Sequence, residues 1–76
     1  MIQLEQIRAK IIDAIKQSGM TQTELAKRLN IYQSAVGQYL SGRAMPALDT
    51  FANLCAVLDL DANDILCVAD YNMSQK

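Results

Sequence analysis

The chain contains no histidine and no tryptophan, and only two of its 76 residues are cysteines. Without histidine, it lacks the side chain that serves most often in acid–base catalysis and metal binding. Cys55 and Cys67 lie in apolar stretches, with neither metal-ligand spacing nor the density of a disulfide scaffold. We expect both to be buried thiols in a reducing cytosol. There is also no nucleophile beside a base and no glycine-rich phosphate loop, so the sequence does not predict an enzyme, a cofactor or a metal site.

Long hydrophobic runs are missing as well. No apolar stretch approaches the roughly 20 residues that span a bilayer, and no basic start followed by an apolar segment marks a signal peptide. We therefore expect a soluble, cytoplasmic protein that does not contact the membrane. The length suits one domain, residues 1–76, with a polar tail at about 70–76, and 51% hydrophobic residues can fill one core.

The sequence also lacks a strong excess of positive or negative charge, because its net charge is −1. Such a value does not favour a polyanionic partner, but the charges are unevenly distributed. Residues 1–43 carry six basic and three acidic side chains, whereas residues 44–76 carry five aspartates and one lysine. A basic half can face nucleic acid while the acidic half faces away. Chance asymmetry in a short chain is the alternative explanation.

Apolar residues at helical spacing predict a first helix over residues 4–18. Thr21, with Glu24 three residues later, has the pattern of a capping box and predicts a second helix that ends at Leu29. Asn30 tolerates a positive φ and can make a tight turn. A third helix is expected to begin near Tyr32 or Gln33 and to end at Ser41.

The remaining sequence predicts two further helices. Residues 43–47, which include the one proline, form a loop before a fourth helix at about 48–58, and Asp61 caps a short fifth helix. Six side chains of the fourth helix are predicted to face the core: Leu48, Phe51, Ala52, Leu54, Cys55 and Leu58. No segment alternates with period two, so we predict an all-α, compact bundle of five short helices.

Residues 22–41 have the features of a helix-turn-helix, in which two short helices are joined by a tight turn. The small Ala26 suits the point where the second helix crosses the first, and Asn30 suits the turn. Apolar side chains on both sides would fix the crossing angle. They are Leu25, Leu29, Ile31 and Val36. This geometry is typical of proteins that place a helix in the major groove of DNA.

The stretch from Met20 to Arg43, followed by Pro46, resembles the λ repressor/Cro (XRE-type) family of helix-turn-helix domains. The resemblance extends over roughly residues 4–67, through Leu54 and Leu58 to Leu66, and Gln33–Gly37 is especially similar to the phage repressors. It implies sequence-specific binding of double-stranded DNA by a transcriptional regulator of phage or plasmid type, most often a repressor.

The resemblance also implies roles for individual residues. Gln33, Ser34 and Gln38 would read base edges. Glutamine suits this role because its amide offers a donor and an acceptor to adenine N6 and N7. Gln22 would contact a phosphate and brace Gln33. Arg43 and Lys27, with Arg28 beside it, would contact phosphates. Ordinary solvated surface positions are the alternative for all of these side chains.

Tyr32 and Leu40 are unusual for the family, and Gly37 is unusual for the interior of a helix. Tyr32 stands where a small capping residue is frequent, so the third helix lacks a good cap, and we expect Tyr32 to contact the DNA backbone or a thymine methyl group. Leu40 replaces a frequently acidic residue and is either core or exposed. Gly37 lies inside a helix, where glycine costs about 1 kcal/mol relative to alanine, which suggests close packing.

A single helix reads few base pairs, so the family generally binds palindromic operators as two-fold dimers. Val68, Tyr71 and Met73 are the predicted dimer contacts, because the C-terminal segment has more apolar groups than a short helix needs. Two other functions stay open. The chain could be the antitoxin of a toxin–antitoxin pair, with a toxin as protein partner, or a protein-interaction module that has lost DNA binding.

Overall fold

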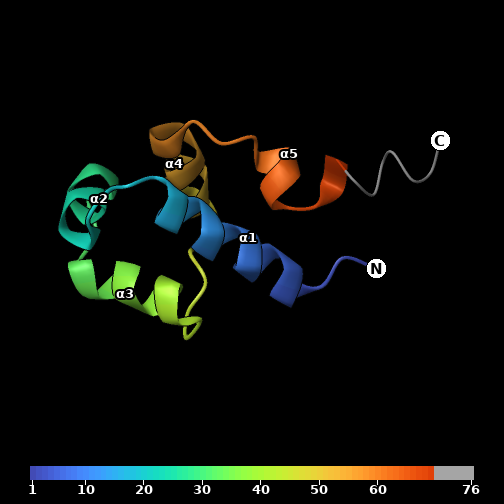
Figure 1. Ribbon diagram of the computed structural model, residues 1–76, viewed down its shortest axis with the longest axis horizontal. Helices are drawn as coiled ribbons and strands as arrows, with labels where there is room; N and C mark the ends of the chain where they lie inside the picture. The colour runs from blue at the N-terminus through green and yellow to red at the C-terminus, as the bar shows by residue number, and fades with distance from the viewer. Residues whose placement is uncertain (70–76) are drawn as a thin grey trace.

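The computed structural model describes residues 1–69 and contains five helices and no strand over that range (Figure 1). The helices are α1 (Leu4–Gln17), α2 (Gln22–Leu29), α3 (Gln33–Ser41), α4 (Leu48–Leu58) and α5 (Ala62–Ile65). α1 contacts both α3 and α5, and α2 contacts α3 and α4. The predicted all-α bundle of five short helices is confirmed.

The helix ends follow local sequence signals. Thr21 Oγ1 accepts a hydrogen bond from the Glu24 N–H at 3.1 Å, and Asp61 Oδ1 accepts one from the Asn63 N–H at 3.0 Å. Asn30 and Gly42 close α2 and α3 in the left-handed conformation, with φ values of 58° and 80°. Of the capping box expected at α2, the hydrogen bond to the Thr21 side chain is present, but the Glu24 side chain does not accept one from the Thr21 N–H in return. The Glu24 carboxylate lies 3.9 Å from Arg28 Nη2, so it is directed toward the next turn of its own helix.

The core is aliphatic and lies where the helices meet. Val36 is 0% exposed, and Leu25 and Leu54 are each 1% exposed. The other buried side chains are Ile11, Ile15, Ala26, Leu29, Tyr39, Phe51, Cys55, Ile65 and Cys67. Both cysteines are free thiols, and Leu40 is half-buried against the core. Among residues 1–69, no helix combines the length and the apolarity needed to cross a bilayer.

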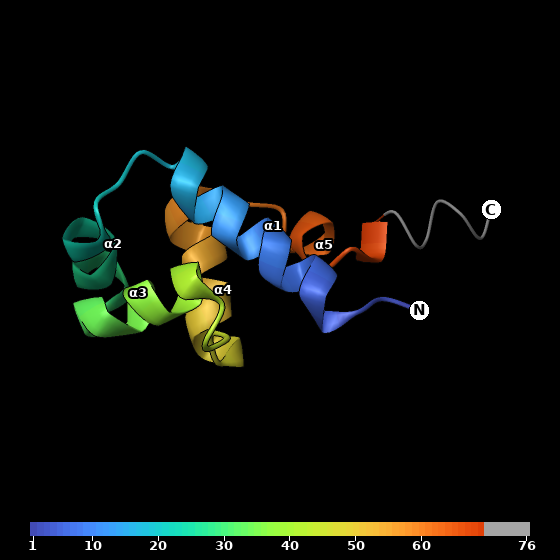
Figure 2. The ribbon, with the colours of Figure 1, turned by 60° about the horizontal axis from the view of Figure 1, so that its bottom comes forward.

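The predicted inward face of α4 is wrong at two positions. Leu48 is 85% exposed and Ala52 is exposed, whereas Phe51, Leu54 and Cys55 are buried. Helical spacing places Leu48 on the same side as Phe51, but the first turn of α4 extends past α3 at the edge of the molecule (Figure 2). The side of that turn at Leu48 is left uncovered, although Phe51 in the same turn is buried, so spacing alone overestimated the burial of Leu48.

Candidate nucleic-acid interface

The turn between α2 and α3 is built from buried apolar contacts and backbone hydrogen bonds. Ala26 is 4% exposed and lies between the two helices, and Val36 of α3 is completely buried. The Ile31 N–H donates to the Ala26 carbonyl at 3.0 Å, and the Asn30 N–H donates to the Lys27 carbonyl at 3.2 Å. These bonds satisfy the carbonyls at the end of α2 and fix the direction in which the chain enters α3. α3 is therefore positioned along one edge of the molecule (Figure 1).

One face of α3 is buried and the other is open to solvent. Val36 and Tyr39 face the core, while Gln33, Ser34 and Gln38 are exposed. Ser41 is also exposed, although its hydroxyl donates to the Gln38 carbonyl at 3.1 Å. α3 contains no charged residue. Its outer face therefore offers amides and a hydroxyl, which can donate and accept hydrogen bonds, without a carboxylate that would repel phosphate.

Gly37 occupies the middle of this outer face, and the predicted close packing is wrong. A Cβ added at Gly37 would have Gln22 Oε1 as its nearest neighbour, at 3.5 Å, which is ordinary van der Waals contact. The fold therefore has room for alanine here. What glycine provides is a position without a side chain between the flanking polar residues, half-buried beside the Gln22 side chain.

Gln33 is braced from α2, but by a different residue from the one expected. Thr23 Oγ1 donates to Gln33 Oε1 at 3.1 Å, and both side chains are exposed. Gln22, the expected brace, instead extends over Gly37. Thr23 was not among the predicted site residues. Its position in the first turn of α2, close to the start of α3, was the available signal.

The N-terminus of α3 is open. Tyr32 is the N-cap residue, makes no side-chain capping hydrogen bond and is 84% exposed. The Ala35 N–H is satisfied by the Tyr32 carbonyl at 3.0 Å, which leaves the N–H groups of Gln33 and Ser34 facing outward. The positive end of the helix dipole lies at the same place. Together these groups can accept an anion, such as a phosphate oxygen.

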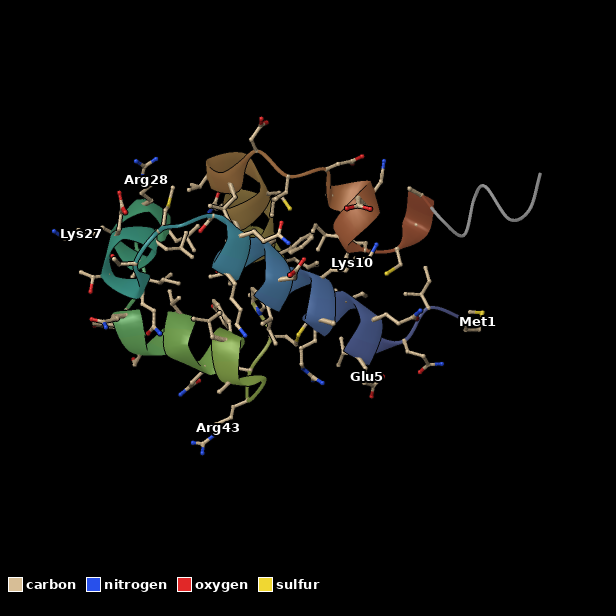
Figure 3. The ribbon with its side chains drawn as sticks, in the orientation of Figure 1. Met1, Glu5, Lys10, Lys27, Arg28 and Arg43 are labelled. Carbon is tan, nitrogen blue, oxygen red and sulfur yellow. The ribbon has the colours of Figure 1, made fainter. Side chains whose placement is uncertain are left out.

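Basic side chains lie at both ends of the α3 edge. Arg43 follows α3 and extends away from the body of the molecule, and Lys27 extends outward from α2 (Figure 3). Arg28 points to the other side of α2 and lies near Glu24. Arg43 and Lys27 therefore lie near the two ends of α3, with Tyr32 between them in the sequence and Gln22 before both.

Of the three predicted dimer contacts, one lies among the described residues. Val68 is half-buried, and Tyr71 and Met73 lie outside the described residues. α5 itself is held to α1 by Lys10, whose Nζ lies 3.4 Å from Asp64 Oδ1 and donates to the Asp64 carbonyl at 3.1 Å. α5 is thus attached to α1 at the surface, and its Ile65 is buried in the core.

One groove of the described surface lies away from α3. A groove of about 350 Å³ lies between α1 and the segment joining α4 to α5, lined by Lys10, Asp13, Ala14, Gln17, Ser18, Leu58, Leu60, Asp64 and Ile65. Three aspartates, Asp59, Asp61 and Asp64, lie on or near this segment, across α1 from α3 (Figure 1). Their charge is thus kept away from the α3 edge.

Burial raises the pKa of the Cys55 thiol, and the negative charge of Asp61 adds to the effect.

The sequence profile of the helix-turn-helix family matches residues 11–65, most of the chain. The protein belongs to this family, in its λ repressor-like branch, which consists of DNA-binding regulators. No curated protein and no solved structure is similar enough to the chain to count as a match. The matched segment includes α2, the turn and α3, so the family and the geometry indicate the same DNA-binding element.

Proposed function

We propose that the protein is a sequence-specific transcriptional regulator, of the repressor type, that inserts α3 into the major groove of double-stranded DNA. The observation that carries this proposal is the two-sided character of α3. Val36, fully buried, anchors one face, while the opposite face presents uncharged hydrogen-bonding groups at the edge of the molecule. An α-helix fits the major groove, where each base pair displays a distinct pattern of donors and acceptors.

In this proposal, Gln33, Ser34 and Gln38 read base edges. All three are exposed and lie on one helix. Because Gly37 has no side chain, this part of α3 adds no group between the helix and the base pairs. A bidentate amide–adenine contact is worth about 1–3 kcal/mol of discrimination against the wrong base, so these side chains can account for the choice of sequence.

Phosphate contacts would hold α3 in register. Tyr32 and the open N–H groups beside it lie at one end of α3, and Arg43 lies beyond the other. Gln22 and Lys27 on α2 would contact the same strand as Tyr32. These contacts carry no sequence information, but they fix the orientation of the helix and give the affinity its salt dependence.

The operator would be a palindrome bound by a homodimer, with the two copies of α3 about 34 Å apart, one turn of DNA. Val68, Tyr71 and Met73 are the proposed dimer contacts. Repression would then follow from steric competition with polymerase at the operator.

Selection of binding sites from a randomised duplex pool tests the proposal. The wild type is compared with Gln33→Ala/Gln38→Ala and with a control, Asn53→Ala/Asn63→Ala, which removes two exposed amides from α4 and α5. We expect the wild type and the control to enrich the same palindrome, and the α3 variant to lose it or relax it. If folded wild type enriches no sequence at low salt, direct base reading is wrong, and the net charge of −1 then favours a protein-interaction module.

Tyr32→Ser tests the contact at the open end of α3. We expect this change to weaken operator binding, although serine is the better N-cap and should stabilise α3. Unchanged operator affinity would exclude Tyr32 from the interface.

A further inference from the structure

We propose that the groove between α1 and the segment joining α4 to α5 is a docking site for a protein partner, which inserts a large apolar side chain flanked by lysine or arginine residues. The groove lies across α1 from α3 (Figure 1). A partner bound there leaves α3 uncovered, so the inference does not depend on how α3 contacts DNA.

Much of the groove lining is apolar. Leu58 and Leu60 line the groove from the segment that joins α4 to α5, and Ala14 lines it from α1. All three side chains are half-buried, so part of their apolar surface stays in contact with water. An apolar side chain of a partner would remove this surface from water, which favours association.

The charge around this apolar surface is negative. Asp13 lines the groove from α1, and Asp59 and Asp61 each follow a lining leucine and are exposed. Residues 44–69 contain no lysine or arginine that could offset these carboxylates. Such a surface attracts basic side chains and repels phosphate. The complementary partner is therefore a basic protein segment and not a nucleic acid.

The basic residue of the groove lining does not reverse this charge. Lys10 extends from α1 toward α5, and its Nζ lies 3.4 Å from Asp64 Oδ1 (Figure 3). Asp64 therefore offsets the charge of Lys10. Asp13 Oδ2 accepts a hydrogen bond from Gln17 Nε2 at 3.0 Å, but a neutral amide leaves the carboxylate charge in place. The lining thus keeps a net negative charge.

A peptide segment fits this groove better than a small molecule does. Pockets for small molecules usually present a few convergent polar groups that fix the orientation of the ligand. Here Asp13, Gln17 and Asp64 are exposed, and the half-buried Ser18 hydroxyl already donates to the Ile15 carbonyl at 2.6 Å. A peptide does not need such groups, because it extends past the groove and its basic residues can reach the exposed aspartates beside it.

Selection of short displayed peptides from a randomised library, on folded wild type without DNA, tests the inference. We expect enrichment of peptides in which a large apolar residue lies between lysines or arginines. A synthetic peptide of the enriched sequence is then titrated by fluorescence anisotropy, and its affinity should fall as the salt concentration rises. No enrichment, or an enriched pattern without basic residues, would overturn the inference.

Two matched pairs of variants locate the binding site of the synthetic peptide. Asp13→Lys should weaken binding by about fivefold, whereas Asp49→Lys, the same change at an exposed position outside the lining, should change it by less than about twofold. Ala14→Leu fills part of the groove without a change in charge and should also weaken binding. Ala9→Leu, at an exposed position of the same helix outside the lining, should not.

Thermal unfolding followed by circular dichroism establishes that each variant is folded. If folded Asp13→Lys and Ala14→Leu bind the peptide as wild type does, the peptide lies elsewhere and the inference is wrong. Gln33→Ala/Gln38→Ala should bind the peptide with wild-type affinity. Failure of this docking site and failure of the proposed DNA reading are therefore distinguishable.

Discussion

Gly37→Ala should stabilise the fold and weaken operator binding at the same time. Gly37 lies inside α3, a helix of nine residues. Its replacement by alanine adds one methyl group, whose nearest neighbour would be Gln22 Oε1 at an unstrained 3.5 Å. Glycine in a helix interior costs about 1 kcal/mol relative to alanine. For a domain of this size, that gain corresponds to a rise in Tm of about 4–8 °C.

The added methyl group would project from the centre of the proposed reading face. We therefore expect lower affinity for the selected operator, with the salt dependence of binding unchanged because no phosphate contact is lost. Thermal unfolding followed by circular dichroism measures the first effect, and operator titration at several salt concentrations measures the second.

Gly42→Ala is the matched control, with the opposite expected sign in stability. Gly42 adopts φ +80°, and an added Cβ would lie 3.4 Å from Arg8 Cδ. The left-handed conformation costs a non-glycine residue about 1–2 kcal/mol, so this variant should lose stability. A lower Tm for Gly37→Ala would refute the reasoning and show that glycine is required by the packing of α3. Unchanged operator affinity would show that the centre of α3 does not closely approach DNA.

Three further predictions concern the scaffold. Asn30→Ala should destabilise the protein by about 1–2 kcal/mol in urea unfolding, because Asn30 has a φ of 58° that alanine adopts only at a cost. Asn30→Gly should leave the stability nearly unchanged, and equal losses in the two variants would contradict this explanation. Val36→Ala should cost about 2–3 kcal/mol, because it empties a fully buried site, whereas exposed Ser34→Ala should change stability by less than about 0.5 kcal/mol. Burial raises the pKa of the Cys55 thiol, so above about pH 8.5 the unfolded chain releases this proton before the folded protein does. The free energy of unfolding should therefore fall as pH rises from that value, and Cys55→Ala should lack this pH-dependent loss; an equal loss in both proteins would assign it to other groups.

Local signals made most of the fold predictable. The caps at Thr21 and Asp61 and the left-handed residue Asn30 act within a few positions of the chain, so the sequence is sufficient to identify them. Leu48 was misjudged because burial depends on whether a neighbouring helix reaches the first turn of α4. Helical spacing does not show which neighbouring helix, if any, covers a given turn.

The candidate site was predictable only where it depends on local sequence signals. Exposure of Gln33, Ser34 and Gln38 follows from the period of α3. The choice between Gln22 and Thr23 as the brace of Gln33 depends on side-chain geometry between two helices, and sequence spacing cannot supply it. The roles of these residues toward DNA stay predictions, as do the dimer contacts of Val68, Tyr71 and Met73.

The absence of charge on α3 has a consequence for how such a protein can change its target. In the proposed function, affinity for the DNA backbone would depend on groups outside this helix, such as Arg43 and Lys27, whereas the choice of sequence would depend on neutral side chains within it. Exchange of one neutral polar residue for another on α3 then alters the preferred operator without altering net charge or the salt response of binding. A lineage can acquire new operators by single substitutions while its general attraction to DNA stays constant.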